Sequence, residues 1–148
     1  MIKSGIYIVT LKNKDPISVN ANDLRISDKC IRVNFLNCKV GRMKELARGA
    51  HRYSKVFGKE NVTFKPLAVV SEARRAEKII LKVLDPWRIR GRTNRKNEWL
   101  SGITPEEAEL YALTALRESG IPFERVDGHN IRIPAPGLCR AMLRRDDA

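Results

Sequence analysis

Residues 5–11 are Gly-Ile-Tyr-Ile-Val-Thr-Leu, a run of mostly apolar, β-branched and aromatic types. Such residues favour extended backbone, where their side chains pack well on a pleated surface. The run ends at residues 12–16, Lys-Asn-Lys-Asp-Pro, a cluster that is typical of a turn. We therefore predict a strand over residues 5–11.

The segment that follows predicts a second strand and a helix. Residues 30–36 alternate between apolar and polar side chains, which indicates a strand or a hairpin leading into residues 39–41, Lys-Val-Gly. Over residues 42–53, apolar residues recur at helical spacing beside a basic stripe, which predicts a helix with one buried and one cationic face. Gly49 lies inside that helix and would cost it about 1 kcal/mol relative to alanine, so we expect the helix to be short or distorted there.

Residues 61–70 predict the next strand, because β-branched and aromatic types recur in them. Pro66 within this segment favours a sheet edge or a bulge. Ser71 is placed to cap a helix over residues 72–84. That helix must end before Pro86, because the residue that precedes a proline is pushed out of helical geometry.

Glu77 is the carboxylate in this helix that needs an explanation. It falls in line with Ala73, Ile80 and Leu84 at steps of four, three and four residues, which places it beside apolar side chains. A carboxylate in such a place is usually paired with a cation or bound to a metal. Both interpretations stay open: a salt bridge to a basic neighbour such as Arg74, or a metal ligand at the edge of the core.

Residues 88–97, Arg-Ile-Arg-Gly-Arg-Thr-Asn-Arg-Lys-Asn, carry five cations in ten positions with little periodicity. This pattern predicts a basic loop that follows phosphates. Trp87 and Trp99 flank the loop. They could stack on nucleic-acid bases or pack into the core, and packing is the commoner role of such residues.

The charge of the chain favours a polyanionic partner. Its 29 lysines and arginines exceed its 17 aspartates and glutamates, which gives a formal charge of +12 on 148 residues. From Lys39 to Trp99 there are seventeen basic and six acidic residues, so this block of 61 residues carries +11 of that charge. Clustering of this kind is typical of nucleic-acid binding, where phosphate contacts supply much of the affinity. The alternative is a soluble protein with a high isoelectric point and no such partner.

The length suits one compact body with a small extension. We expect residues 1–102 to form the main domain and residues 103–148 the extension. No segment approaches the roughly eighteen apolar residues of a membrane span, and the first residues lack a signal peptide. We therefore expect a cytoplasmic protein with no membrane partner. The three cysteines and two histidines do not have the spacing of a structural zinc site.

The extension has its own helix signal. Residues 104–107, Thr-Pro-Glu-Glu, form a capping box with proline at the first helical position, which predicts a helix over residues 105–119. Residues 123–126 and 130–133 predict a hairpin, and residues 137–145 a short final helix. An α-β-β-α piece of this size is too small to be stable alone. We expect it to pack on the main domain, extend its sheet, support a dimer or contact DNA.

The order of several residues resembles the GIY-YIG family of nucleases over about residues 5–99. Residues 5–7, Gly-Ile-Tyr, stand in the place of the first motif of the family. Residues 39–41, Lys-Val-Gly, stand in the place of the second motif, with lysine replacing tyrosine. Arg48 is similar to the catalytic arginine of the family, and Glu77 to its single metal-binding glutamate.

Two further positions of the family pattern are matched by alternatives. The family asparagine corresponds to Asn94 or Asn97, of which Asn97 is favoured. His51 or Tyr53 takes the place of the histidine or tyrosine that usually follows the arginine. In the commonest spacing of the family, counted from Gly41, the catalytic arginine would stand at position 49. This chain has Gly49 there, and Arg48 comes one position earlier.

The resemblance agrees with the fold class that the elements predict, α/β or α+β, with a small mixed or antiparallel sheet flanked by helices. It implies a DNA endonuclease of the restriction or homing kind that uses Mg²⁺, or Mn²⁺ in its place. It implies that Tyr7, Lys39, Arg48 and Glu77 are catalytic and that Glu77 holds the metal. We expect the following residues to bind DNA: Arg42, Lys44, His51, Arg52, Arg88, Arg90, Arg92, Arg95, Lys96 and Asn97.

These residue types suit phosphodiester hydrolysis on chemical grounds. A lone carboxylate can hold Mg²⁺ with most of its waters retained, and the arginine fork of Arg48 suits two phosphate oxygens. Tyr7 would act as the general base or relay a proton. Lys39 would lower the pKa of Tyr7 or of the attacking water through its positive charge.

Two other functions fit the same sequence. One is a non-catalytic nucleic-acid-binding module of the same fold. The other is a small structural protein that assembles on RNA or DNA, for which Glu77 would be dispensable. For the nuclease, cutting both strands at a palindrome would require a homodimer, because one chain has one active centre.

Overall fold

The computed structural model describes residues 3–19, 31–90 and 96–126, apart from the side chains of residues 96 and 97. The strands are β1 (Gly5–Leu11), β2 (Ile17–Val19), β3 (Ile31–Val33), β4 (Cys38–Met43), β5 (Val62–Val69), β6 (Arg88–Arg90), β7 (Lys96–Leu100) and β8 (Glu124–Arg125). The helices are α1 (Gly49–Phe57), α2 (Ala73–Val83) and α3 (Pro105–Glu118), with short 3₁₀ helices η1 (Leu46–Arg48) and η2 (Asp85–Trp87).

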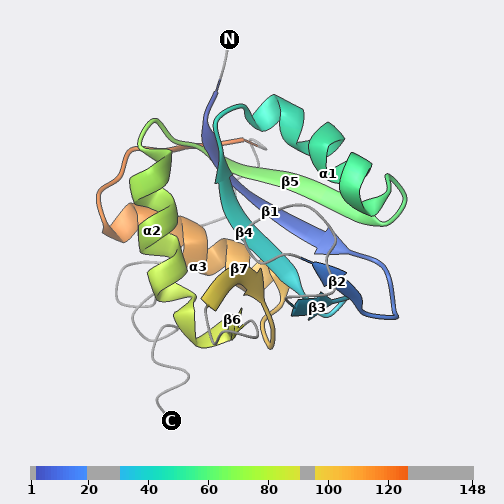
Figure 1. Ribbon diagram of the computed structural model, residues 1–148. Coiled ribbons are helices and arrows are strands. Elements are labelled where there is room, and N and C mark those ends of the chain that lie inside the picture. Colours follow the sequence, from blue (N-terminus) through green and yellow to red (C-terminus); the bar gives the residue numbers. More distant parts are fainter. Residues whose placement is uncertain (1–2, 20–30, 91–95, 127–148) are drawn as a thin grey trace.

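Six of the strands form one sheet in the order β6-β7-β4-β1-β5-β8 (Figure 1). Each described pair of neighbouring strands in it is antiparallel. β2 and β3 pair separately as a two-stranded sheet. The protein is therefore of the α+β class. The sequence predicted a mixed or an antiparallel sheet, and the described strand pairs are antiparallel.

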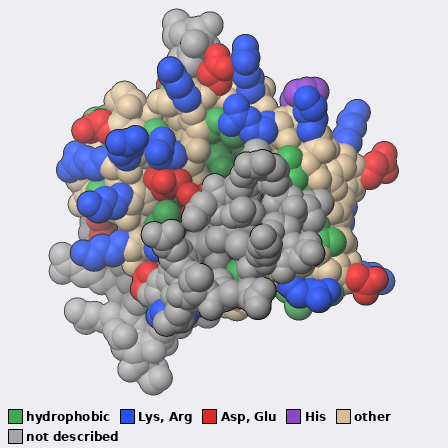
Figure 2. Space-filling model, in the orientation of Figure 1, with side chains coloured by type: hydrophobic (Ala, Val, Ile, Leu, Met, Phe, Trp, Pro, Cys, Tyr) green, Lys and Arg blue, Asp and Glu red, His purple; other side chains and the backbone are tan. Residues whose placement is uncertain are grey.

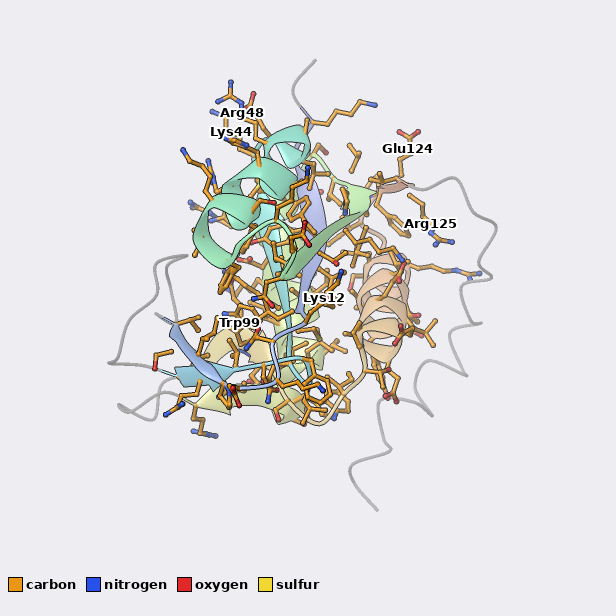
Figure 3. All side chains as sticks on the ribbon, turned by 90° about the vertical axis from the view of Figure 1, so that its right-hand side faces the viewer. Lys12, Lys44, Arg48, Trp99, Glu124 and Arg125 are labelled. Carbon is orange, nitrogen blue, oxygen red and sulfur yellow. The ribbon has the colours of Figure 1, made fainter. Side chains whose placement is uncertain are left out.

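β1 lies inside the sheet, between β4 and β5, and has the bounds that the sequence predicts. Its side chains alternate between two apolar clusters. Ile6 and Ile8 face α2 and α3 on one side of the sheet, whereas Tyr7 and Val9 face α1 and the β2–β3 pair on the other. Figure 3 shows α1 and α3 on opposite sides of the sheet. Because both faces are covered, β1 is apolar along nearly its whole length.

The strand β4 corrects the sequence prediction for the start of the next helix. Arg42 and Met43 were expected to be helical, but they continue β4, in which Met43 pairs with Gly5 of β1. At these two residues the backbone hydrogen bonds to the central strand β1 outweigh the helical spacing of the apolar residues in the local sequence. The helix α1 begins later, at Gly49, so this glycine lies at the end of the helix and not in its interior. Arg48 belongs to the preceding 3₁₀ turn.

β5 and α2 follow the prediction with one exception. Pro66 lies opposite Tyr7, where the β1–β5 register shifts, which confirms the expected bulge. α2 ends at Val83, ahead of Pro86, as expected. Ser71 does not cap it: the residue in the N-cap position is Glu72, which makes no side-chain capping bond.

The basic segment is not a plain loop, because its ends form the strands β6 and β7. Residues 91–95 between them lie outside the described residues. Trp99 is fully buried, and Trp87 packs on Tyr111 with ring centres 5.1 Å apart. The interpretation of the two tryptophans as core residues is therefore confirmed.

The extension begins with α3, whose predicted capping box is present: Thr104 accepts from the backbone N–H of Glu107, and the Glu107 side chain accepts from the backbone N–H of Thr104. α3 packs on α2 and the sheet, and β8 adds to the sheet beside β5. The predicted hairpin partner at 130–133 and the final helix at 137–145 lie outside the described residues. Among the described helices, none is both long and apolar enough to cross a membrane.

Candidate functional site

The candidate site lies at the edge of β4, where this strand runs past the end of β7. β7 pairs with β4 through Cys38 and Lys39, and among the described residues the later part of β4 has β1 as its strand neighbour. The backbone N–H of Arg42 donates to the Oε2 atom of Glu77, 3.0 Å away on α2. The Arg42 Nε atom also lies 3.4 Å from Glu77 Oε1. The side chain of Glu77 thus takes the place of a strand partner at this edge.

A second carboxylate, Glu98, lies near Glu77 and acts on its ionisation. Glu98 comes from β7, and its Oε2 atom lies 3.5 Å from the ammonium of Lys39 on β4. Lys39 is only 5% exposed, and its ammonium lies 5.4 Å from the centre of the Tyr53 ring. Sequence reasoning missed Glu98. The sequence did contain a signal, because Glu98 is the one acidic residue between the five cations of residues 88–97 and Trp99.

Two buried tyrosines complete the cluster. The hydroxyls of Tyr7 on β1 and Tyr53 on α1 are 2.5 Å apart and share a hydrogen bond. Tyr7 lies opposite Gly41 in the β1–β4 register. A Cβ atom on Gly41 would come within 2.6 Å of the Tyr7 hydroxyl and 3.2 Å of Glu98 Oε2. The glycine of the Lys-Val-Gly segment is therefore required by this close approach.

The environment of Glu77 favours its neutral form. Burial, followed by the negative charge of Glu98, raises the pKa of Glu77 to about 7. The N–H bond and the positive charge of Arg42 act in the opposite direction but do not cancel these effects. In the absence of another cation, the two carboxylates therefore compete for charge, which is the usual result of placing two acids together.

The hydroxyl groups of the two tyrosines are harder to ionise than usual. Burial raises the pKa of Tyr7, and the mutual hydrogen bond only partly offsets it. Burial also raises the pKa of Tyr53, and the proximity of Tyr7 adds to the effect. The net effect of the surroundings is therefore to keep the Tyr7 hydroxyl protonated. The positive charge of Arg52 lowers the pKa of both tyrosines, although its effect is smaller than that of burial.

The structure brings Tyr7, Lys39 and Glu77 together but leaves Arg48 elsewhere. The Arg48 side chain is 74% exposed and its Nε atom lies 2.8 Å from Glu45. Figure 3 shows Arg48 and Lys44 at the end of the molecule away from Trp99, the neighbour of Glu98 in β7. Arg48 there lines an open cavity of about 380 Å³ with residues of β5 and β8.

The residues predicted to bind DNA divide into three groups. Arg42, Lys44, His51, Arg52 and Arg90 are exposed. Arg88 is partly buried and lies 3.6 Å from Asp85. The side chains of Arg92, Arg95, Lys96 and Asn97 lie outside the described part, as does Asn94. In Figure 2, cationic side chains gather over α1 and over α2, on two sides of the face that is shown.

The donor set fits one kind of metal ion. Within the described residues, no three side chains of histidine, cysteine, aspartate or glutamate come together. Zinc sites usually need three or four such ligands. Mg²⁺ differs, because it commonly takes one or two carboxylates and completes its shell with water and substrate phosphate. The Glu77–Glu98 pair fits Mg²⁺ in this respect.

Comparisons with protein-family models, with curated proteins and with solved structures find no match.

The shared tyrosine hydrogen bond makes a stability prediction. Tyr7→Phe or Tyr53→Phe should each destabilise the protein by about 1–3 kcal/mol, because the remaining hydroxyl stays buried without its partner. The double variant should lose clearly less than the sum of the two. Urea denaturation of the four proteins measures the difference, which we expect to be about 1 kcal/mol. Strictly additive losses would contradict a direct coupling of the hydroxyls.

Because the pKa of Glu77 is raised, we predict that the stability of the protein depends on pH. Because the folded pKa of Glu77 lies above the ordinary value of 4.5, the folded protein binds an extra proton between that value and about 7. Stability is therefore lost as pH rises through this window. In EDTA, Glu77→Gln should be more stable than the wild type by roughly 1–3 kcal/mol near pH 8 and about equal near pH 4.

Urea titrations across this pH range provide the measurement, with Glu72→Gln as the matched control. Glu72 lies one residue before α2, is exposed and pairs only with Arg75 among the described residues. Its variant should show no such pH dependence. A Glu77→Gln protein that is less stable than the wild type near pH 8 would mean that the Arg42 contacts outweigh burial and Glu98.

Proposed function

We propose that this protein is a Mg²⁺-dependent DNA endonuclease of the GIY-YIG type, acting in the cytoplasm. The observation that carries the proposal is the convergence of Glu77 and Glu98 with the Tyr7–Tyr53 hydroxyl pair around Gly41. The family resemblance selects Tyr7 and Glu77 among these residues, and it gives Tyr53 as one of two alternatives for the residue after the arginine. They come from different elements, and the cluster lies within a strongly cationic part of the chain.

Glu77 and Glu98 would hold the metal ion. A bound Mg²⁺ would neutralise the charge of the scissile phosphate and make the attacking water more acidic. Glu77 extends from a regular helix and is fixed by the Arg42 N–H, and Glu98 is held by the Lys39 ammonium. Both carboxylates are thus positioned before substrate arrives, which reduces the cost of ordering the site.

Two groups are placed to handle the proton that the attacking water loses: a carboxylate that can accept it and a tyrosine hydroxyl that can pass it on. The Tyr7 hydroxyl and Glu98 Oε2 both lie against Gly41. A water between them could donate to the carboxylate while the hydroxyl orients it. Because burial keeps Tyr7 protonated, its role in this proposal is to orient and relay, and the basic group is a carboxylate.

Arg52 is the better placed of the two helix arginines to stabilise charge on the phosphate. Its charge acts on both Tyr7 and Tyr53, whereas Arg48 is paired with Glu45 on another part of the surface. A guanidinium that faces the phosphate can bridge two of its oxygens. We therefore assign to Arg52 the role that the sequence pattern assigns to Arg48.

The second candidate function is a nucleic-acid-binding module of the same fold that does not cut. One observation favours it: Arg48, the arginine that the family pattern would make catalytic, is exposed, pairs with Glu45 and lies at the end of the molecule away from Trp99. In such a module the carboxylate pair would have no catalytic role. Cleavage assays separate the two functions, whereas binding assays do not.

We expect purified protein to cut supercoiled plasmid DNA in Mg²⁺ or Mn²⁺ and not in EDTA. Glu77→Gln and Glu98→Gln should each lower the cleavage rate by at least about 100-fold, since residues that only support a metal ligand already cost about 10–100-fold. Both variants should still bind DNA in EDTA, because each removes a negative charge from the interface. Gel analysis of plasmid nicking and fluorescence anisotropy measure the two properties.

Glu72→Gln is the control in this assay and should cut at the wild-type rate. Normal DNA binding by the wild type, with no cutting of DNA or RNA in either metal, would favour the non-catalytic module. Cutting that survives both Glu77→Gln and Glu98→Gln would reject this site.

The two arginines provide a separate test of the same site. At saturating DNA, Arg52→Gln should lower the cleavage rate by about 100-fold, the usual effect of removing one group that stabilises transition-state charge. Arg48→Gln should have little effect, because it removes an exposed ion pair with Glu45. A larger loss for Arg48→Gln would return the catalytic role to Arg48.

A further inference from the structure

α2 carries a row of cations that the candidate site does not use. Arg74, Lys78 and Lys82 follow one another at intervals of four residues, and all three side chains are exposed. We call these three residues the α2 stripe. Arg75 beside them pairs with Glu72, 3.5 Å away. Within the described part of the chain, no carboxylate pairs with any residue of the stripe.

Such a row is unusual for a merely solvated helix face. Exposed helix faces commonly alternate charges, because acidic and basic residues four positions apart stabilise the helix. Here like charges repeat at that spacing, which destabilises an isolated helix slightly. The helix tolerates them because Ala76 and Ile80 on its other side are fully buried in the core.

The stripe has a rigid relation to the candidate site, since Glu77 belongs to the same helix. At about 100° per residue, Lys78 lies roughly a quarter turn around the helix from Glu77. Arg74 lies about 4.5 Å before Glu77 along the axis and Lys82 about 7.5 Å after it. The cations therefore extend to both sides of the carboxylate. In Figure 2, cationic side chains cover the outer side of α2.

The spacing of the stripe suits a nucleic-acid strand. Successive members are about 6 Å apart along the axis and the whole stripe spans about 12 Å. One DNA strand advances about 3.4 Å per phosphate along the duplex axis, so the stripe spans about three to four steps from one phosphate to the next. Arginine and lysine are the side chains that bind backbone phosphates without reading sequence.

We propose that the α2 stripe binds the backbone of duplex DNA on either side of the phosphate that lies at Glu77. This inference rests on the proposed function as far as DNA binding is concerned, and it does not need cleavage. The stripe adds three backbone contacts to those expected of the basic residues of α1. It also orients the duplex along α2 and not across it.

The test is the salt dependence of DNA binding. Arg74→Gln, Lys78→Gln and Lys82→Gln are combined in one variant, because glutamine keeps the helix propensity of these positions. A short fluorescein-labelled DNA duplex is titrated in EDTA at several salt concentrations. Each lost phosphate contact lowers the slope of log K against log salt by about 0.9, so the variant should lose about 2 to 3.

The matched control combines Lys12→Gln, Lys14→Gln and Lys59→Gln, which removes the same net charge. These lysines are exposed and belong to the β1–β2 and α1–β5 turns, on the side of Figure 1 opposite α2. In this control variant the slope of log K against log salt should fall by less than about 1, because the three lysines contribute only to the overall electrostatic field of the protein. Circular dichroism and thermal unfolding verify that both variants are folded.

The outcomes separate this inference from the proposed function. A large loss of slope in the stripe variant and a small loss in the control support the inference. Equal losses in the two variants, or no loss in the stripe variant, overturn it even when the wild type cuts DNA. A wild-type protein that does not bind DNA would reject the proposed function as well. The choice of duplex DNA as partner would be overturned if the wild type bound single-stranded RNA more tightly than duplex DNA and the stripe variant lost that preference.

Discussion

The antiparallel pairing of β1 with β4 is the constraint on which the candidate site depends. Its register places Tyr7 directly opposite Gly41. A shift of one residue would turn every side chain of β1 to the other face of the sheet. Tyr7 would then leave the aromatic cluster of α1, and Ile6 would leave the core beneath α2 and α3. The two apolar clusters therefore hold the register, and the register holds the site.

Burial of the polar residues in this cluster is costly, and the structure offsets the cost with specific contacts. The Tyr7 and Tyr53 hydroxyls satisfy one another, and the Lys39 ammonium has both Glu98 and the face of the Tyr53 ring. Buried polar groups are tolerated only where partners of this kind exist. The Glu77–Glu98 contact is different, because it brings together two groups of the same charge. A fold selected for stability alone would gain by replacing one of them with an amide.

Much of the fold follows from local sequence signals. The apolar run at residues 5–11, the proline bulge at Pro66 and the capping box before α3 each have one dominant physical explanation, and each is found. The start of α1 was misplaced because residues 42–53 have a helical period that a strand partner overrides, and that partner is far away in the sequence. The class of the fold could thus be predicted, while the boundary between β4 and α1 could not.

The same distinction applies to the site. Glu77 could be selected from the sequence, because a carboxylate in line with apolar residues departs from what its helix needs, whereas Tyr7 and Lys39 were selected through the family resemblance. Glu98 was missed, and Arg52 was selected only as one of ten expected DNA-binding residues, because in the sequence both are charged residues in a charged region. They come close to Glu77 and Tyr7 only when β7 lies beside β4 and α1 lies over Tyr7. Long-range pairing is the information that a single sequence does not carry locally.

The electrostatics of the cluster bear on which of the two candidate functions is more consistent with the structure. Cations on α1 and α2 attract a phosphate backbone, yet Glu98 and the ionised form of Glu77, whose pKa is raised to about 7, place negative charge beside these cations and would repel the backbone. A protein that only binds nucleic acid would bind more tightly without them. A protein that cuts needs them, because a divalent cation between carboxylates and phosphate turns the repulsion into attraction in both directions. The acidic pair within a cationic surface is thus a cost to binding alone and an advantage only when a metal ion joins the complex.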